Sequence, residues 1–150
     1  MTECWTPRTG SWNQVADFTL GPLQNWAQGV TAWTLGTGPT LSSGGCGEAC
    51  TGLVTIKDGD YEFETSYYML AQFSKGLKPG GTVVSGTGSY KDDQGKGVEA
   101  VGAVNPDGSR GVVMVNTFGN DIYVHLNTSD GVWSGNVPSE SVTTWVLPKA

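Results

Sequence analysis

Hydrophobic positions in the first half of the chain recur first at helical spacing and then at strand spacing. Residues 1–5 have the pattern of a strand end. A helical run follows, with its apolar side chains at Val15, Phe18, Leu20, Leu23 and Trp26. Gly21-Pro22 interrupts this run, so we expect a kink or two short helices there, and Gly29 is expected to end the helix. Residues 30–35 are a compact β-rich run, and strand, helix and strand together predict a βα unit of a parallel sheet or barrel.

The next stretch predicts a long loop, a hairpin and a second helix. Residues 36–52 are rich in Gly, Ser and Thr, and a loop of that length in a compact domain is usually functional or disordered. Residues 53–64 predict a β-hairpin, because two short β-rich runs flank Asp58-Gly59, a strong signal for a two-residue turn. The second helix is predicted to begin near residue 65 and to stop at Gly76.

After residue 81 the pattern changes to strands and turns only. Strands are predicted at residues 82–87, 98–104, 110–117, 122–126 and 142–147. Asn105-Pro106-Asp107-Gly108 is the clearest turn, since Pro presets the bend and Gly accepts positive φ. These strands predict an all-β antiparallel sandwich. We therefore divide the chain into a strand–helix part, residues 1–78, and a β-sandwich domain, residues 79–150.

Composition and charge narrow the classes of partner. The 150 residues carry a net charge of −6 with scattered Lys and Arg, so no basic patch is available for nucleic acid. No apolar run approaches the roughly 20 residues that span a bilayer. Metal binding is not expected, because one cysteine pair and the distant His125 do not make a usable ligand set. Cys46 and Cys50 could close a small loop in an extracellular protein or remain free thiols in the cytosol.

The strand ends carry the candidate chemistry. Glu3 lies at the end of a strand that enters a helix, which is where barrel enzymes place catalytic groups. Trp33 lies at the corresponding end of the next strand and could offer an apolar platform to a sugar. The alternative is that Trp5 and Trp33 are packing residues and that Glu3 is a solvated surface group.

Motifs spread in order over nearly the whole chain resemble the C-terminal part of glycoside hydrolase family 30. They are Thr2-Glu3-Cys4, Asn25-Trp26, residues 29–35, Tyr67-Tyr68-Met69-Leu70-Ala71-Gln72-Phe73-Ser74-Lys75, Pro79-Gly80, Asn105-Pro106-Asp107-Gly108 and Thr144-Trp145. The family includes glucosylceramidases and fungal endo-β-1,6-glucanases and galactanases. The resemblance implies an α+β fragment: the last two βα units of a (β/α)8 barrel, followed by an antiparallel β-sandwich.

The same resemblance implies roles for individual residues. Glu3 matches the nucleophile of a retaining glycosidase, whose acid/base Glu lies on an earlier barrel strand outside this sequence. Trp33 matches the aromatic residue that borders the sugar site at the end of the last barrel strand, Trp5 is a second candidate for substrate binding, and no cofactor is implied. Many members have Asp-Trp-Asn where this chain has Ala32-Trp33-Thr34, which affects sugar specificity, and an aromatic at Gly76, which we expect to affect only the helix end.

The family also implies a setting and partners. The cysteine-containing loop is most similar to that of secreted fungal members, which implies secretion and a Cys46–Cys50 disulfide. The implied substrate is a β-linked glycan or a glycosphingolipid. Since retaining hydrolysis needs two carboxyl groups, we expect the isolated chain to be inactive without the N-terminal barrel segment. The alternatives are a non-catalytic carbohydrate-binding or structural β-sandwich, with Trp133 as a candidate platform residue, and a truncated gene product.

Overall fold

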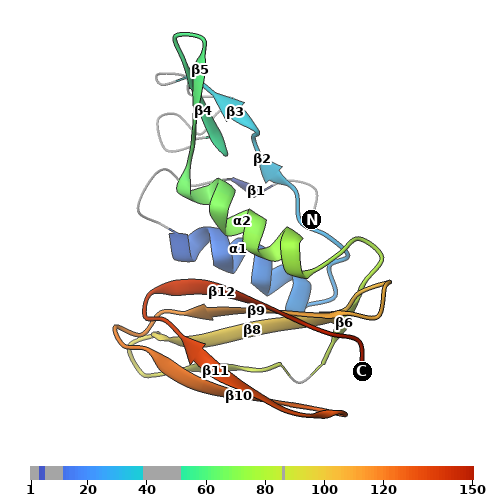
Figure 1. Cartoon of the computed structure of the whole chain (residues 1–150). Coiled ribbons are helices and arrows are strands. Elements are labelled where there is room, and N and C mark those ends of the chain that lie inside the picture. Colours follow the sequence, from blue (N-terminus) through green and yellow to red (C-terminus); the bar gives the residue numbers. More distant parts are fainter. Residues whose placement is uncertain (1–3, 6–11, 39–51, 86) are drawn as a thin grey trace. The chain divides into compact units, whose positions relative to one another are not determined.

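The computed structural model describes residues 4–5, 12–38, 52–85 and 87–150 (Figure 1). The chain divides into two compact units, Met1–Ala71 and Gln72–Ala150. The helix α2 (Thr65–Gly76) crosses the division, so its last turn belongs to the second unit.

The first unit begins with a strand–helix–strand sequence. β1 (Cys4–Trp5) and β2 (Ala32–Trp33) pair in parallel, and α1 (Trp12–Gln24) connects them. The register places Trp5 opposite Trp33. A parallel pair joined by a helix is the βα arrangement predicted from the sequence, whereas its origin in an eight-stranded barrel stays a prediction.

The first helix ends earlier than the hydrophobic pattern predicts. One helix continues through Gly21 and Pro22 and stops at Gln24, not at Gly29. The Pro22 carbonyl accepts hydrogen bonds from the backbone N–H groups of Asn25 and Ala27, both at 3.0 Å. Trp26 then has a φ of 69° and is 96 % exposed. The prediction that Trp26 belongs to the buried helical face is therefore wrong, because its left-handed backbone conformation places it outside the helix.

A small three-stranded sheet follows β2. β3 (Gly36–Thr37) pairs in parallel with β4 (Val54–Lys57), and β4 pairs antiparallel with β5 (Asp60–Phe63). Asp58 and Gly59 have φ angles of 53° and 83°, as a two-residue type I′ turn requires. The predicted hairpin is confirmed, and β3 adds a short strand at the start of the stretch predicted to be a loop.

The second unit is a two-layered β-sandwich (Figure 1). Its larger sheet has the order β12-β9-β8-β6, all antiparallel, with β7 also paired to β8. Strands β10 and β11 form an antiparallel hairpin in the second layer. The strands are β6 (Thr82–Val84), β7 (Ser89–Lys91), β8 (Gly97–Val104), β9 (Arg110–Asn116), β10 (Ile122–Thr128), β11 (Gly131–Val137) and β12 (Ser141–Leu147). The antiparallel sandwich is as predicted, with β7 and β11 as additional strands.

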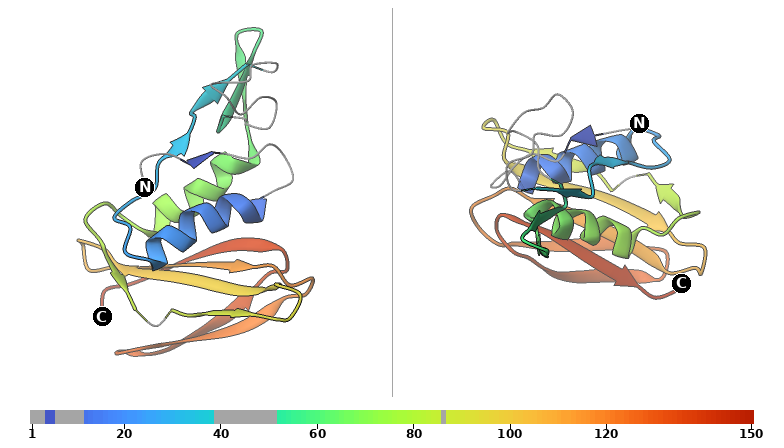
Figure 2. Two further views of the ribbon diagram at one scale, coloured as in Figure 1. Left: turned by 180° about the vertical axis from the view of Figure 1, so that it is seen from behind. Right: turned by 90° about the horizontal axis from the view of Figure 1, so that it is seen from above.

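Apolar side chains from both layers fill the interior of the sandwich. The layers are seen from two further sides in Figure 2. The buried cluster comprises Ala100, Val112, Met114 and Val137, with Ile122, Val124, Leu126 and Trp145 packed against it. Gly135 lies so close to Trp145 that a Cβ there would be 2.8 Å from the indole ring. A glycine on β11 therefore makes room for the largest side chain of the interior.

The opposite face of the larger sheet contacts the last turn of α2. A Cβ on Gly111 of β9 would lie 1.9 Å from the Gly76 carbonyl oxygen, and a Cβ on Gly76 would lie 2.6 Å from the Thr144 methyl group. Thr144 Oγ1 lies 2.9 Å from the Gln72 carbonyl and 2.7 Å from Gln72 Oε1, within hydrogen-bond distance of both. Gly76 therefore does more than end a helix, and the expectation that its identity affects only the helix end is wrong.

Asn105 secures the same helix end through its buried side chain. Its Nδ2 donates to the Gly76 carbonyl at 3.0 Å and to Ser109 Oγ at 3.1 Å, while its Oδ1 accepts from the Lys78 N–H at 2.8 Å. The asparagine opens the predicted turn, where Gly108 has a φ of 83° and donates its N–H to the Asn105 carbonyl. One amide thus satisfies two backbone groups at the helix end and also binds the Ser109 hydroxyl after the turn.

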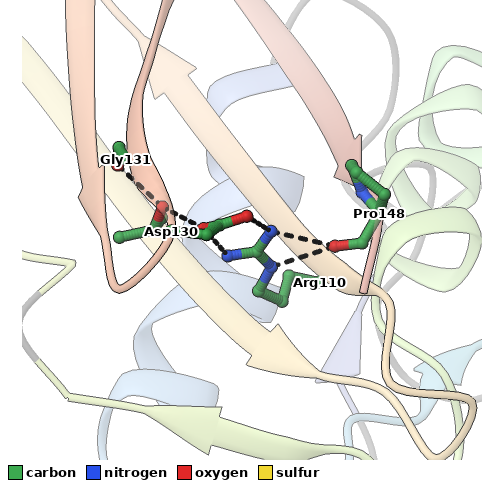
Figure 3. A network of polar contacts seen from close by, with 5 residues as sticks. Arg110, Asp130, Gly131 and Pro148 are labelled. Atoms are coloured by element: carbon green, nitrogen blue, oxygen red, sulfur yellow. Dashed lines mark hydrogen bonds and ion pairs between the residues drawn. The ribbon is translucent and has the colours of Figure 1, made fainter. Parts of the chain in front are cut away.

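Arg110 holds the β10–β11 turn against the end of the chain (Figure 3). Its guanidinium makes a bidentate pair with Asp130, at 2.5 and 2.8 Å, and donates to the Pro148 carbonyl at 2.9 and 3.1 Å. Thr128 Oγ1 lies within hydrogen-bond distance of both Asp130 Oδ1 and the Gly131 carbonyl. The Arg110 hydrogen bonds, and then that of Thr128, hold the pKa of Asp130 well below its ordinary value of 3.8.

We predict that Gly111→Ala destabilises the second unit by about 1–3 kcal/mol or more, because the obstructing atom is backbone and cannot rotate away. Chemical unfolding would measure the change in the free energy of unfolding. Gly119→Ala is the matched control, since its Cβ would meet nothing within 4 Å. Equal stability of the two variants would contradict the close contact between α2 and β9.

We also predict that Asp130→Asn lowers Tm at neutral pH, because it removes the charge that Arg110 binds. A carboxylate whose pKa is lowered in the folded state stabilises the fold fully at pH values above its unfolded-state pKa, near 3.8. This stabilisation is lost as the pH falls through the folded-state pKa. The difference in Tm between the wild type and Asp130→Asn should therefore shrink below about pH 4. The exposed Asp93→Asn serves as control. A difference that grows on acidification would contradict this account.

Candidate active site

The sequence-predicted site residues fall partly within the described structure. Glu3 lies outside the described residues, directly before β1, and Cys46 and Cys50 lie outside them as well. The backbone register places Trp5 beside Trp33 on neighbouring parallel strands. The structure therefore brings together the two strand positions predicted to border a sugar, while the roles of Glu3 and the disulfide remain predictions.

Trp33 is available to a ligand. Its side chain is 38 % exposed at the end of β2, and the peptide bond that follows it, to Thr34, is cis. An indole that is partly packed and partly exposed can offer one ring face to an apolar surface. This degree of exposure is compatible with the sugar platform predicted from the sequence.

A backbone ladder connects the segment after Trp33 to the β4–β5 hairpin. The Leu53 N–H donates to the Thr34 carbonyl, and the Glu64 N–H donates to the Leu53 carbonyl, each at 2.9 Å. Three chain segments thus lie side by side, so Thr34 and Glu64 are separated by two strand spacings, about 10 Å. The hairpin is therefore built on the same framework as Trp33.

Four aromatic side chains cluster on the hairpin and at the start of α2, a group called here the hairpin aromatic cluster: Tyr61, Phe63, Tyr67 and Tyr68. Phe63 stacks on Tyr67 with ring centroids 4.2 Å apart, and Tyr61 contacts the edge of Phe63 at 5.3 Å. Tyr67 and Tyr68 form a further edge contact at 5.5 Å. Figure 2 shows the hairpin leading directly into α2, which explains how both elements contribute.

The hairpin aromatic cluster is exposed although it is aromatic. Tyr61 is 63 % exposed, Tyr68 54 % and Phe63 40 %. Exposed aromatic rings with hydroxyl groups suit ligands that have both apolar faces and hydrogen-bonding rims, as sugar rings do. The cluster was not predicted from the sequence, because Tyr61 and Phe63 belong to a predicted strand and Tyr67-Tyr68 to a predicted helix. No contact between these two elements was expected. The signal was four aromatics within eight residues, on two elements joined by a short connection.

Acidic groups accompany the aromatic rings. Glu64 accepts a short hydrogen bond from the Thr55 hydroxyl, which fixes its carboxylate beside the ladder. Asp58, Asp60 and Glu62 are exposed on the hairpin and can accept hydrogen bonds from hydroxyl groups. Among the described residues, no group of three or more His, Cys, Asp or Glu side chains could hold a metal ion.

Trp133, the candidate platform residue on the β-sandwich, is less exposed than Trp33. Trp133 lies opposite Leu126 and is only half-exposed, on the side of the hairpin that faces the sandwich interior. The outer side of β10 instead presents Tyr123, 66 % exposed, in edge contact with His125 at 5.4 Å. His125 Nδ1 is 2.7 Å from Ser134 Oγ. Tyr123 and His125, like the exposed Tyr90 of β7, are therefore further candidates for a carbohydrate-binding role of the sandwich.

Within the described residues, neither helix is long and apolar enough to cross a bilayer.

The described residues form a parallel βα unit and an exposed aromatic hairpin, followed by an antiparallel β-sandwich. Residues 81–145 match the glycosyl hydrolase family 30 β-sandwich domain. This stretch of the chain is a β-sandwich domain of that family, and the resemblance to the C-terminal part of family 30 is confirmed.

Known proteins similar to the whole chain agree with this assignment. An endo-1,6-β-D-glucanase of Trichoderma harzianum is 68 % identical over 99 % of the chain and 31 % of its own length. The endo-1,6-β-D-glucanase neg1 of Aspergillus fumigatus is 61 % identical over 100 % of the chain and 32 % of its own length. The solved endo-β-1,6-glucanase BT3312 is similar at 25 % identity with a TM-score of 0.82, covering 100 % of the chain and 35 % of that structure. The chain thus spans about a third of the length of these relatives.

Proposed function

We propose that this chain is the C-terminal portion of a retaining β-glycosidase that hydrolyses β-1,6-linked glucan. The single observation that carries the proposal is 68 % identity, over almost the entire chain, to a protein named as an endo-1,6-β-D-glucanase. Galactan and glucosylceramide are the other substrates that the sequence resemblance implies, and the experiments below compare them directly.

Glu3 is assigned the role of nucleophile. In a retaining glycosidase one carboxylate attacks the anomeric carbon and a second carboxyl group protonates the leaving oxygen, with about 5 to 5.5 Å between the two. Since the chain spans about a third of its relatives, the acid/base is assigned to the part of the enzyme that this chain does not match. The isolated chain is then expected to hydrolyse nothing.

Trp33 and the hairpin aromatic cluster are assigned to substrate binding. The ladder from Thr34 through Leu53 to Glu64 supports this assignment, because it links the segment after Trp33 to the hairpin within about two strand spacings. The net charge of −6 suits a neutral polysaccharide better than an anionic one. The resemblance of the cysteine-containing loop to that of secreted fungal members supports a place of action outside the cell.

A hybrid enzyme tests the catalytic assignment. This chain would replace the matching segment of the Trichoderma harzianum relative, and the hybrid would be assayed on linear β-1,6-glucan, β-1,6-galactan and glucosylceramide. We expect turnover of the glucan, and Glu3→Gln in the hybrid should reduce kcat by more than about 10³-fold, because an amide cannot replace the attacking carboxylate.

The controls for the hybrid separate catalysis from folding. Glu140→Gln, at an exposed carboxylate in the sandwich, should leave kcat unchanged. The 150-residue chain alone should show no turnover on any of the three substrates. If the isolated chain hydrolyses a substrate and Glu3→Gln abolishes this activity, no second carboxyl group outside the chain is needed, and the proposal is refuted. A hybrid enzyme that prefers galactan or glucosylceramide would refute the substrate assignment.

A second variant tests the binding assignment. Phe63→Ala in the hybrid should raise KM for β-1,6-glucan about 3- to 10-fold, with a small effect on kcat, because loss of ring stacking weakens binding without touching the reacting atoms. Tyr90→Ala, at an exposed aromatic of the sandwich, is the matched control. Circular dichroism would verify folding. An unchanged KM for folded Phe63→Ala would contradict the role of the cluster.

A further inference from the structure

The outer side of the β10–β11 hairpin presents a row of exposed side chains. Tyr123, His125 and Asn127 alternate with half-buried residues along β10, so all three face away from the sandwich interior. Across the hairpin, Asn127 lies opposite Val132 of β11. Val132 is 61 % exposed, so its side chain is open to a group attached across the hairpin.

Asn127 begins the one Asn-X-Ser/Thr sequence of the chain, Asn127-Thr128-Ser129. The sequence leaves β10 and enters the tight turn before β11. No hydrogen bond from the Asn127 side chain is found among the described residues. Thr128, by contrast, is held by Asp130 and the Gly131 carbonyl. Asn127 is thus exposed, while the side chain of the next residue, Thr128, is held within the turn.

The surroundings of Asn127 can accommodate a large substituent. Directly opposed side chains in an antiparallel pair have Cβ atoms about 5 Å apart, so a group on Asn127 lies over Val132. His125, two residues before Asn127 on the same face, supplies an exposed ring beside it. A first sugar on Asn127 would cover the exposed Val132 with its apolar face and extend away from the sandwich.

We propose that Asn127 is an N-glycosylation site, modified by an oligosaccharide from a polyprenyl-pyrophosphate donor. In this transfer the Asn127 amide nitrogen forms a bond to C1 of the first N-acetylglucosamine and loses one proton. The C1–oxygen bond to the pyrophosphate breaks, and the lipid pyrophosphate leaves with the bonding electron pair. The proposal rests on secretion, which belongs to the proposed function, but not on catalysis.

The test is expression of the full chain with a secretory leader in yeast. We expect the intact mass of the secreted chain to exceed the sequence mass by one oligosaccharide, and treatment with an N-glycosidase to remove this excess. The enzyme should convert Asn127 to Asp, which peptide mass spectrometry locates directly. Asn127→Gln and Ser129→Ala should each abolish the mass excess, whereas Ser129→Thr should retain it.

A neighbouring asparagine provides the matched control. Asn136 is exposed on the outer side of β11 but is followed by Val137 and Pro138, so Asn136→Gln should leave the glycan in place. A secreted chain that carries no N-linked oligosaccharide, or one that keeps it in Ser129→Ala, would overturn the proposal. Because the readout is mass, it is independent of glucanase activity, and inactivity of the hybrid enzyme would leave this result unaffected.

Discussion

The second unit depends on a backbone contact that leaves no space for a side chain. The Gly76 carbonyl at the end of α2 occupies the place that a Cβ of Gly111 in β9 would take. Two glycines from distant parts of the sequence are therefore required at one point. Asn105 and Thr144 supply the hydrogen bonds around it, since a helix end this close to a sheet must have its polar groups satisfied.

Neighbouring residues of β12 serve the two faces of the same sheet. Thr144 reaches the last turn of α2, whereas Trp145 packs into the sandwich interior against Gly135. Alternation along a strand makes this division possible, because successive side chains point to opposite faces. The Thr144-Trp145 pair, which contributed to the family resemblance, therefore has a physical explanation: one residue binds the helix and the next fills the core.

Much of the architecture could be predicted from local signals. The Asp58-Gly59 and Asn105–Gly108 turns and the antiparallel sandwich follow from turn chemistry and alternation, which depend on near neighbours. The early end of α1 could not be predicted in this way, because the spacing of hydrophobic residues does not indicate the left-handed backbone conformation of Trp26, whose φ is 69°. β11 was missed because Ser134, Gly135 and Asn136 are weak strand formers whose pairing with β10 decides the outcome.

The candidate site was predictable in part for the same reason. Trp33 could be found from its place at a strand end, and the structure leaves it partly exposed. The hairpin aromatic cluster could not, because Phe63 and Tyr67 stack only when a strand and a helix meet. Among the described residues, the surface of the hairpin combines these aromatic rings with the exposed carboxylates of Asp58, Asp60 and Glu62. Under the proposed function, Glu3 is assigned as the nucleophile and its acid/base partner to the part of the relatives that this chain does not match.

The most direct measurement of this assignment is covalent trapping of the nucleophile. A 2-deoxy-2-fluoro-β-glucoside with a good leaving group would be incubated with the hybrid enzyme, because the fluorine slows hydrolysis of the glycosyl-enzyme intermediate. Peptide mass spectrometry would then locate the added sugar. The account predicts a single label on the Glu3 carboxylate, absent in Glu3→Gln. A label on any other carboxylate of an active enzyme would contradict it.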